Sequence, residues 1–91
     1  MSFRRPNCVF SDEYQALRDV IIEARREAGL TQRQLASRLG RSASHIGRIE
    51  IGERRVDTLE LVRMAKSLGV EPTHLFRQIC ERIDATTDAK G

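Results

Sequence analysis

The sequence predicts an all-α fold of five short helices. Apolar residues recur at spacings of three and four along five segments, which is the period of a helix with one buried face. Residues that can cap a helix start precede most of these segments, and glycines end several of them. Aromatic residues make up only 4% of the 91 residues. We therefore expect one small domain with a core of Leu, Ile, Val and Ala.

The first expected helix begins at Ser11, whose hydroxyl can cap it, with two acids placed favourably in the first turn. Its apolar stripe continues to Gly29, a residue able to adopt the left-handed conformation that ends a helix. Residues 1–10 precede it without helical periodicity. We expect them to form a flexible N-terminal arm.

Residues 31–52 contain two short helical patterns joined by residues 40–42 only. Thr31 and Gln34 can form a capping box at the first start, and Ser42 can cap the second. A glycine follows each pattern. So short a link makes the two helices cross steeply and leaves the second on the outside, which predicts a helix-turn-helix.

Two further helices are expected after this motif. Asp57 and Glu60 can form a cap pair, and an apolar stripe follows it. Pro72 suits the first turn of a last helix over residues 72–84. The domain is thus expected to span residues 11–84.

The polar residues 85–91 follow this last stripe. We expect them to form a disordered tail.

Positive charge is concentrated on the helix-turn-helix and the loop after it. The whole chain carries +3, whereas residues 31–55 hold six arginines against two glutamates. All six bases are Arg, whose planar fork matches phosphate oxygens and guanine edges. Charge and motif coincide, so the sequence predicts binding to double-stranded DNA.

Other classes of function find little support. No apolar run is long enough to span a membrane and no signal peptide begins the chain, so we expect a cytoplasmic location. Cys8 and Cys80 lie far apart without metal-ligand spacing, and we expect neither a metal nor a disulfide. Ser44 and His45 are the adjacent pair that resembles a nucleophile and its base. Neighbours on a helix diverge by about 100°, so the two side chains are poorly placed to form the hydrogen bond that such catalysis needs. We expect no enzyme, no cofactor and no small-molecule effector.

Residues 18–70 resemble the Cro and repressor-type helix-turn-helix domain, the XRE family. The resemblance rests on Gly-Leu-Thr-Gln at 29–32, Leu-Ala at 35–36, Ile-Glu-x-Gly at 49–52 and the stretch 65–70. It implies a lambda-repressor-like fold with helix 42–51 in the DNA major groove. Ile51 departs from the family, which often has Asn there.

The same resemblance implies roles for individual residues. Arg48 is able to bind guanine O6 and N7, Ser44 can donate or accept, and Ala43 can pack on a thymine methyl. We expect the His45 side chain to face a DNA base, a phosphate or the solvent. The expected base-reading set is Ser42, Ala43, Ser44, His45 and Arg48, the expected phosphate set is Gln32, Arg33, Ser37, Arg41, Arg54 and Arg55, and Arg25 with Glu50 is expected to form a structural ion pair.

The last helix is apolar over a wider arc than one core contact needs. Leu75, Ile79 and Ile83 form one stripe, and Phe76 and Cys80 form a neighbouring one. We expect this helix to join a homodimer, with all five residues as interface candidates. The alternative is a fully internal helix in a monomer.

The sequence thus predicts a transcriptional regulator, most often a repressor in this family. It would bind a near-palindromic operator as a homodimer. An antitoxin of a toxin–antitoxin pair is the alternative, because it would use the same fold. A third hypothesis is an adaptor that has lost DNA binding, which the basic helix-turn-helix opposes.

Overall fold

In a computed structural model of the chain, residues 11–90 are described, and within them five helices follow one another without a strand. They are α1 (Asp12–Glu27), α2 (Gln32–Leu39), α3 (Ala43–Glu50), α4 (Thr58–Leu68) and α5 (Pro72–Lys90). The backbone alone is described for 87–90. The expected arm, residues 1–10, lies outside the described residues.

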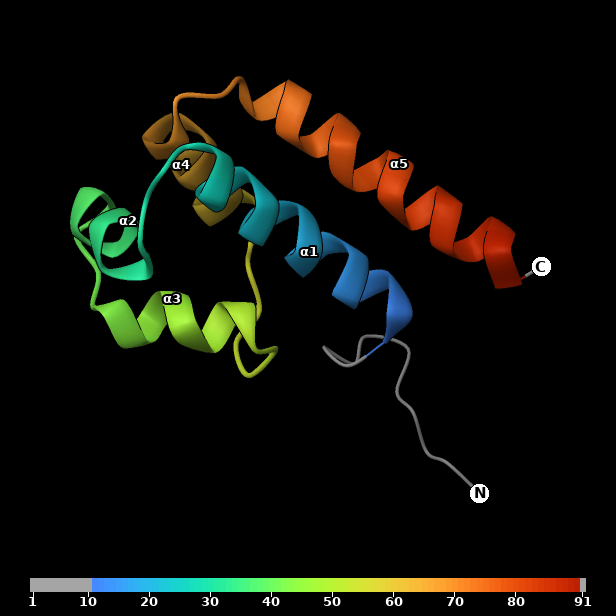
Figure 1. Cartoon of the computed structure of the whole chain (residues 1–91), viewed down its shortest axis with the longest axis horizontal. Coiled ribbons are helices and arrows are strands. Elements are labelled where there is room, and N and C mark those ends of the chain that lie inside the picture. The colour runs from blue at the N-terminus through green and yellow to red at the C-terminus, as the bar shows by residue number, and fades with distance from the viewer. Residues whose placement is uncertain (1–10, 91) are drawn as a thin grey trace.

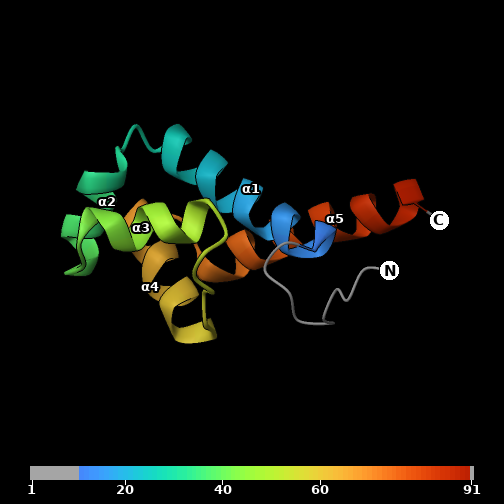
Figure 2. The same cartoon turned by 90° about the horizontal axis from the view of Figure 1, so that it is seen from below.

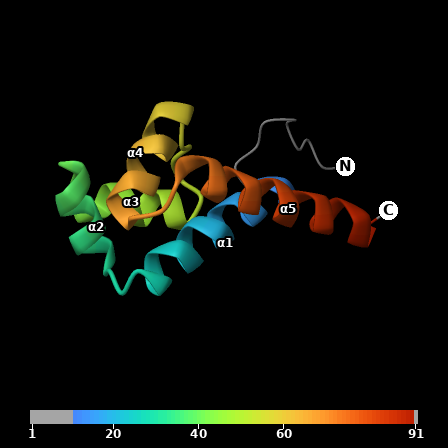
Figure 3. The ribbon, with the colours of Figure 1, turned by 90° about the horizontal axis from the view of Figure 1, so that it is seen from above.

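Helices α1 and α5 run side by side in opposite directions, with α2, α3 and α4 gathered at one end of the pair (Figure 1). Seen from above, α5 lies lengthwise along α1 (Figure 3). No helix of the described residues is long and apolar enough to cross a membrane.

Local capping bonds fix the helix starts that the sequence predicts. The hydroxyl of Ser11 accepts from the Tyr14 amide at 3.1 Å. Thr31 and Gln34 form a complete capping box, with bonds of 3.0 and 2.8 Å. Each bond satisfies an amide that the helix itself leaves without a partner.

Only half of the cap pair expected at α4 forms. Asp57 accepts from the backbone amide of Glu60 at 2.7 Å. The side chain of Glu60 does not return to the cap but lies against His45 of α3. The Glu60 side chain thus contacts α3 instead of forming the expected hydrogen bond at the start of α4.

Helix α5 runs on to Lys90. The prediction of a disordered tail is therefore wrong for residues 85–90, which continue the helix. The stretch 73–90 contains neither Gly nor Pro, so nothing in it breaks the helix where its apolar stripe ends. A loss of apolar residues marks the end of burial rather than the end of a helix.

The core is aliphatic, as the composition predicts. One cluster joins α1, α2, α3 and α4, and a second joins α1, α4 and α5. The first contains Ile21, Leu35, Ala36, Ile46, Met64 and Leu68, and the second contains Val20, Ala65, Leu75 and Ile79.

Candidate DNA interface

Helix α3 lies on the outside of the molecule and is held by one face. Ile46 and Ile49 are fully buried in the core. Figure 2, the view from below, shows α3 with no other helix in front of it. The face opposite the two isoleucines is therefore free to meet a partner.

Ser44, Arg48 and Ile51 share that free face. They recur at intervals of four and three residues, so they lie above one another on the helix, and all three are exposed. Among the described residues the Arg48 guanidinium has no hydrogen-bond or ion-pair partner. The face thus offers a hydroxyl, an open guanidinium and an apolar group, with Ala43 half-buried beside them.

Ser42, expected among the base-reading residues, caps α3. Its hydroxyl accepts from the His45 amide at 3.3 Å and lies 3.0 Å from the Ser44 hydroxyl. The residue remains exposed. The main role of the Ser42 side chain is to accept a hydrogen bond from a backbone amide that the first turn of α3 leaves without a partner.

His45 turns away from the free face of α3. Its Nε2 lies 2.6 Å from Oε2 of Glu60 on α4, and both side chains are only 12% exposed. This contact occupies the imidazole and directs it toward α4, so the geometry removes His45 from the base-reading set. The two residues are fifteen apart in the chain, and no local pattern links them.

A buried ion pair ties α3 to α1. Arg25 donates to Glu50 through Nε at 2.6 Å and through Nη2 at 3.0 Å. Its Nη1 also binds the Leu30 carbonyl at 2.8 Å. The Gln32 amide joins the same carboxylate at 2.8 Å. Gln32, expected at a phosphate, is therefore half-buried and bound inside the protein.

Two further residues of α1 hold the loop after α3, and no motif in the sequence assigns them this role. The Tyr14 hydroxyl accepts from the Val56 amide at 2.7 Å. Arg18, 95% buried, lies against Gly52 and donates to Gln15. Residues 14, 18 and 25 lie at intervals of four and seven, one face of a helix. Ile21 lies on the same face and is fully buried, so no separate polar face marks these residues in the sequence.

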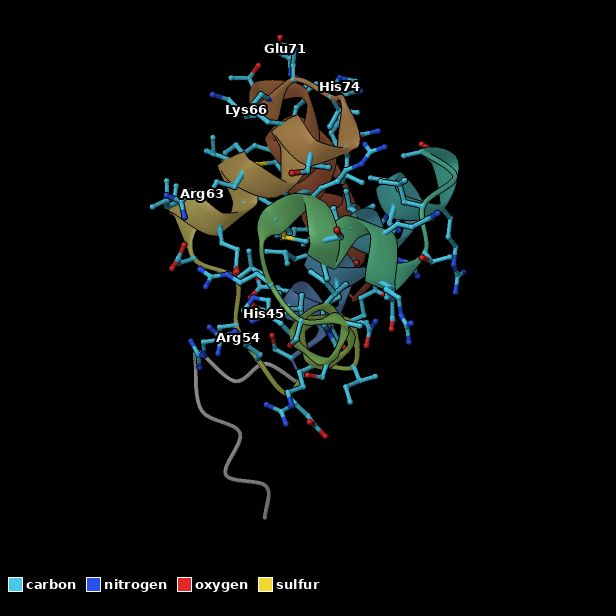
Figure 4. All side chains as sticks on the ribbon, turned by 90° about the vertical axis from the view of Figure 1, so that its left-hand side faces the viewer. His45, Arg54, Arg63, Lys66, Glu71 and His74 are labelled. Carbon is cyan, nitrogen blue, oxygen red and sulfur yellow. The ribbon has the colours of Figure 1, made fainter. Side chains whose placement is uncertain are left out.

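The remaining phosphate candidates are exposed and lie on the elements just before and just after α3. Arg33 and Ser37 lie on α2, Arg41 lies on the turn, and Arg54 and Arg55 lie on the loop. Figure 4 shows Arg54 on an outer flank of the molecule. Arg38 behaves differently, because it donates to the Ser67 carbonyl at 2.8 Å near the end of α4.

The two apolar stripes of α5 have different environments. Leu75 and Ile79 are 0% and 2% exposed and belong to the core, so their assignment to a dimer interface is wrong. Ile83 packs against the same cluster. Phe76 is 57% exposed and Cys80 is half-buried.

A groove of about 590 Å³ opens between α4 and α5, and Phe76 and Cys80 line it. The other residues that line the groove come from the same two helices. They are Thr58, Leu61, Val62, Pro72, Thr73 and Arg77.

A helix-turn-helix family profile matches residues 21–75, more than half of the chain. This range contains α2, the turn and α3. The chain belongs to the XRE family of helix-turn-helix proteins. It is a DNA-binding regulator of that family, and α3 is the second helix of its helix-turn-helix. No curated protein sequence matches the chain.

Solved structures of similar proteins have the same fold. An XRE-family like protein from Pseudomonas syringae pv. tomato is 42% identical, with a TM-score of 0.70 over 74% of this chain and 82% of that one. The restriction-modification controller C.AhdI from Aeromonas hydrophila is 32% identical, with a TM-score of 0.62 over 71% and 99%. The controller C.Esp1396I, solved as a tetramer with its 35 base-pair operator, is 27% identical, with a TM-score of 0.72 over 80% and 96%.

Proposed function

We propose that this XRE-family regulator inserts α3 into the major groove of an operator and represses transcription by occupying it. The open guanidinium of Arg48 on the free face of α3 carries this proposal. A guanidinium can bind the O6 and N7 of guanine with two parallel hydrogen bonds. The neighbouring Ser44 hydroxyl and Ala43 methyl suit other base edges in the same groove.

We propose that the exposed arginines and the serine near α3 bind DNA phosphates on either side of the major groove. Arg33 and Ser37 lie on α2, Arg41 lies on the turn before α3, and Arg54 and Arg55 follow the end of α3. Gln32 bonds to Glu50 through its amide, so we assign any phosphate contact there to the backbone amides at the α2 start. Such contacts fix the protein on the duplex without reading its sequence.

A second copy of the chain is the proposed occupant of the groove between α4 and α5. Phe76 exposes a large apolar surface there, and a symmetric dimer would cover it on both copies. The operator-bound tetramer of C.Esp1396I supports an oligomeric arrangement on DNA. Two α3 helices about 34 Å apart would require a near-palindromic operator with half-sites about one turn apart.

A random-duplex selection with the purified protein identifies the operator, and two variants then test the proposal. We expect Arg48→Ala to weaken the selected site by about 1–3 kcal/mol and to relax preference at one or two base pairs. Arg54→Ala should weaken all sequences alike and reduce the salt slope by about one unit. An Arg48→Ala protein with unchanged affinity and base preference would contradict this placement of α3.

A further inference from the structure

A cleft of about 100 Å³ lies between the α2–α3 turn and the first turns of α4. Three arginines from three separate elements line it: Arg41 from the turn, Arg54 from the loop and Arg63 from α4. All three are exposed. Figure 4 shows Arg54 and Arg63 on the same flank of the molecule. The volume equals that of about three water molecules in the liquid.

Two carboxylates also line the cleft, and each is already engaged. Asp57 accepts the backbone amide of Glu60 at 2.7 Å, as the cap of α4. Glu60 itself lies 2.6 Å from His45 Nε2. Within the described residues neither carboxylate forms an ion pair with a lining arginine. Three arginines against two acids give the lining of the cleft a net positive charge.

We propose that this cleft binds a phosphate group, with Arg63 as a ligand beside Arg41 and Arg54. Guanidinium groups match phosphate oxygens with paired, charge-assisted hydrogen bonds. Arg63 lies outside the contact set expected from the helix-turn-helix, so its role is the new element.

The phosphate could come from two sources. The first is the DNA backbone beside α3, in which case the inference rests on the proposed function. The second is a free phosphate compound, which would bind without DNA.

The DNA source is tested by titrating the selected operator at several salt concentrations. For Arg63→Ala we expect a salt slope smaller by about one unit and roughly fivefold weaker binding at 0.15 M salt, whatever the sequence. Lys66→Ala is the matched control, because Lys66 is exposed on the same helix but does not line the cleft. It should leave slope and affinity close to those of the original protein.

The free source is tested without DNA. Inorganic phosphate is titrated while the melting temperature is followed, with Arg63→Ala and Lys66→Ala in parallel. A rise in melting temperature that Arg63→Ala abolishes and Lys66→Ala keeps supports a site for a free phosphate compound.

The inference is overturned if Arg63→Ala matches Lys66→Ala in both titrations while circular dichroism shows an intact fold. Failure of the proposed function has a different signature. If Arg48→Ala relaxes base preference but Arg63→Ala changes nothing, DNA binding stands and the cleft assignment falls. If the original protein binds no duplex, the proposed function falls and the phosphate titration alone decides the cleft.

Discussion

Glu50 is the buried carboxylate that links α3 to α1 and to α2. It is 8% exposed and accepts hydrogen bonds from Arg25 and from Gln32. The ion pair with Arg25 and the hydrogen bond from the Gln32 side chain therefore form one network, with the Glu50 carboxylate at its centre. Removing that charge leaves the Arg25 guanidinium buried without a counter-ion.

We expect Glu50→Gln to lower the free energy of unfolding by about 3–5 kcal/mol, because breaking a buried pair leaves the other charge uncompensated. Urea denaturation followed by circular dichroism measures this loss. The double variant Arg25→Met with Glu50→Leu should recover much of the stability, since it removes both charges. A loss below about 1 kcal/mol for Glu50→Gln would show that water reaches Arg25.

At the scale of the element, α3 carries one glycine that its backbone does not require. A Cβ at Gly47 would meet only the Gln32 Oε1, at 3.5 Å, an ordinary contact. Gly52, just after the helix, differs in both respects. Its φ is +88°, and a Cβ there would collide with the Arg18 guanidinium.

We therefore expect opposite effects from the same substitution at the two positions. Gly47→Ala should stabilise the fold by up to about 1 kcal/mol, because alanine restricts the unfolded chain and favours the helix. Gly52→Ala should destabilise it by about 1–2 kcal/mol or more through the left-handed backbone. Urea midpoints compare the pair, and a Gly47→Ala protein that is stabler but binds operator worse would show that the duplex approaches Gly47 closely.

Local patterns predicted the elements well because capping and apolar periodicity act over a few residues. Thr31 and Gln34 cap α2 as the sequence indicates. The partnership of His45 with Glu60 and the burial of Arg18 depend on how helices meet, so no spacing in the chain announces them. The same limit explains why the two apolar stripes of α5 could not be told apart before the packing was known.

The α1–α5 pair is fastened at its surface by Glu23 and Arg82. Arg82 donates to both carboxylate oxygens, at 2.7 and 3.1 Å. This hydrogen bonding lowers the pKa of Glu23 below its ordinary value of 4.5. The side chains remain 52% and 39% exposed, so water screens the pair and its contribution is small.

We expect Arg82→Ala to reduce the free energy of unfolding by less than about 1 kcal/mol at pH 7. Because the folded state lowers the pKa of Glu23, the stabilisation is present above pH 4.5 and is lost as pH falls through the lowered pKa. Urea unfolding of both proteins between pH 7 and pH 2 should therefore converge at the acid end. A difference that persists at pH 2 would mean that the Arg82 chain acts by packing rather than by charge.

For the molecule as a whole, the proposed dimer depends on the groove between α4 and α5. The original protein should sediment at about twice the 10.4 kDa chain mass if a second copy covers it. Phe76→Asp places a charge in the groove while leaving the core intact, because Phe76 is 57% exposed. Ile79→Asp is unsuitable, since Ile79 is 2% exposed and its replacement would unfold the chain.

We expect Phe76→Asp to sediment as a monomer with an unchanged circular dichroism spectrum and to bind the full operator much more weakly than the original protein. Leu59→Asp is the matched control for mass, because Leu59 is also 57% exposed but lies outside the groove. It should remain dimeric. If the original protein is a monomer at micromolar concentration and on a single half-site, a second copy does not cover the groove. The exposed Phe76 would then favour a different protein partner, and the expectation of a near-palindromic operator would fall with the dimer.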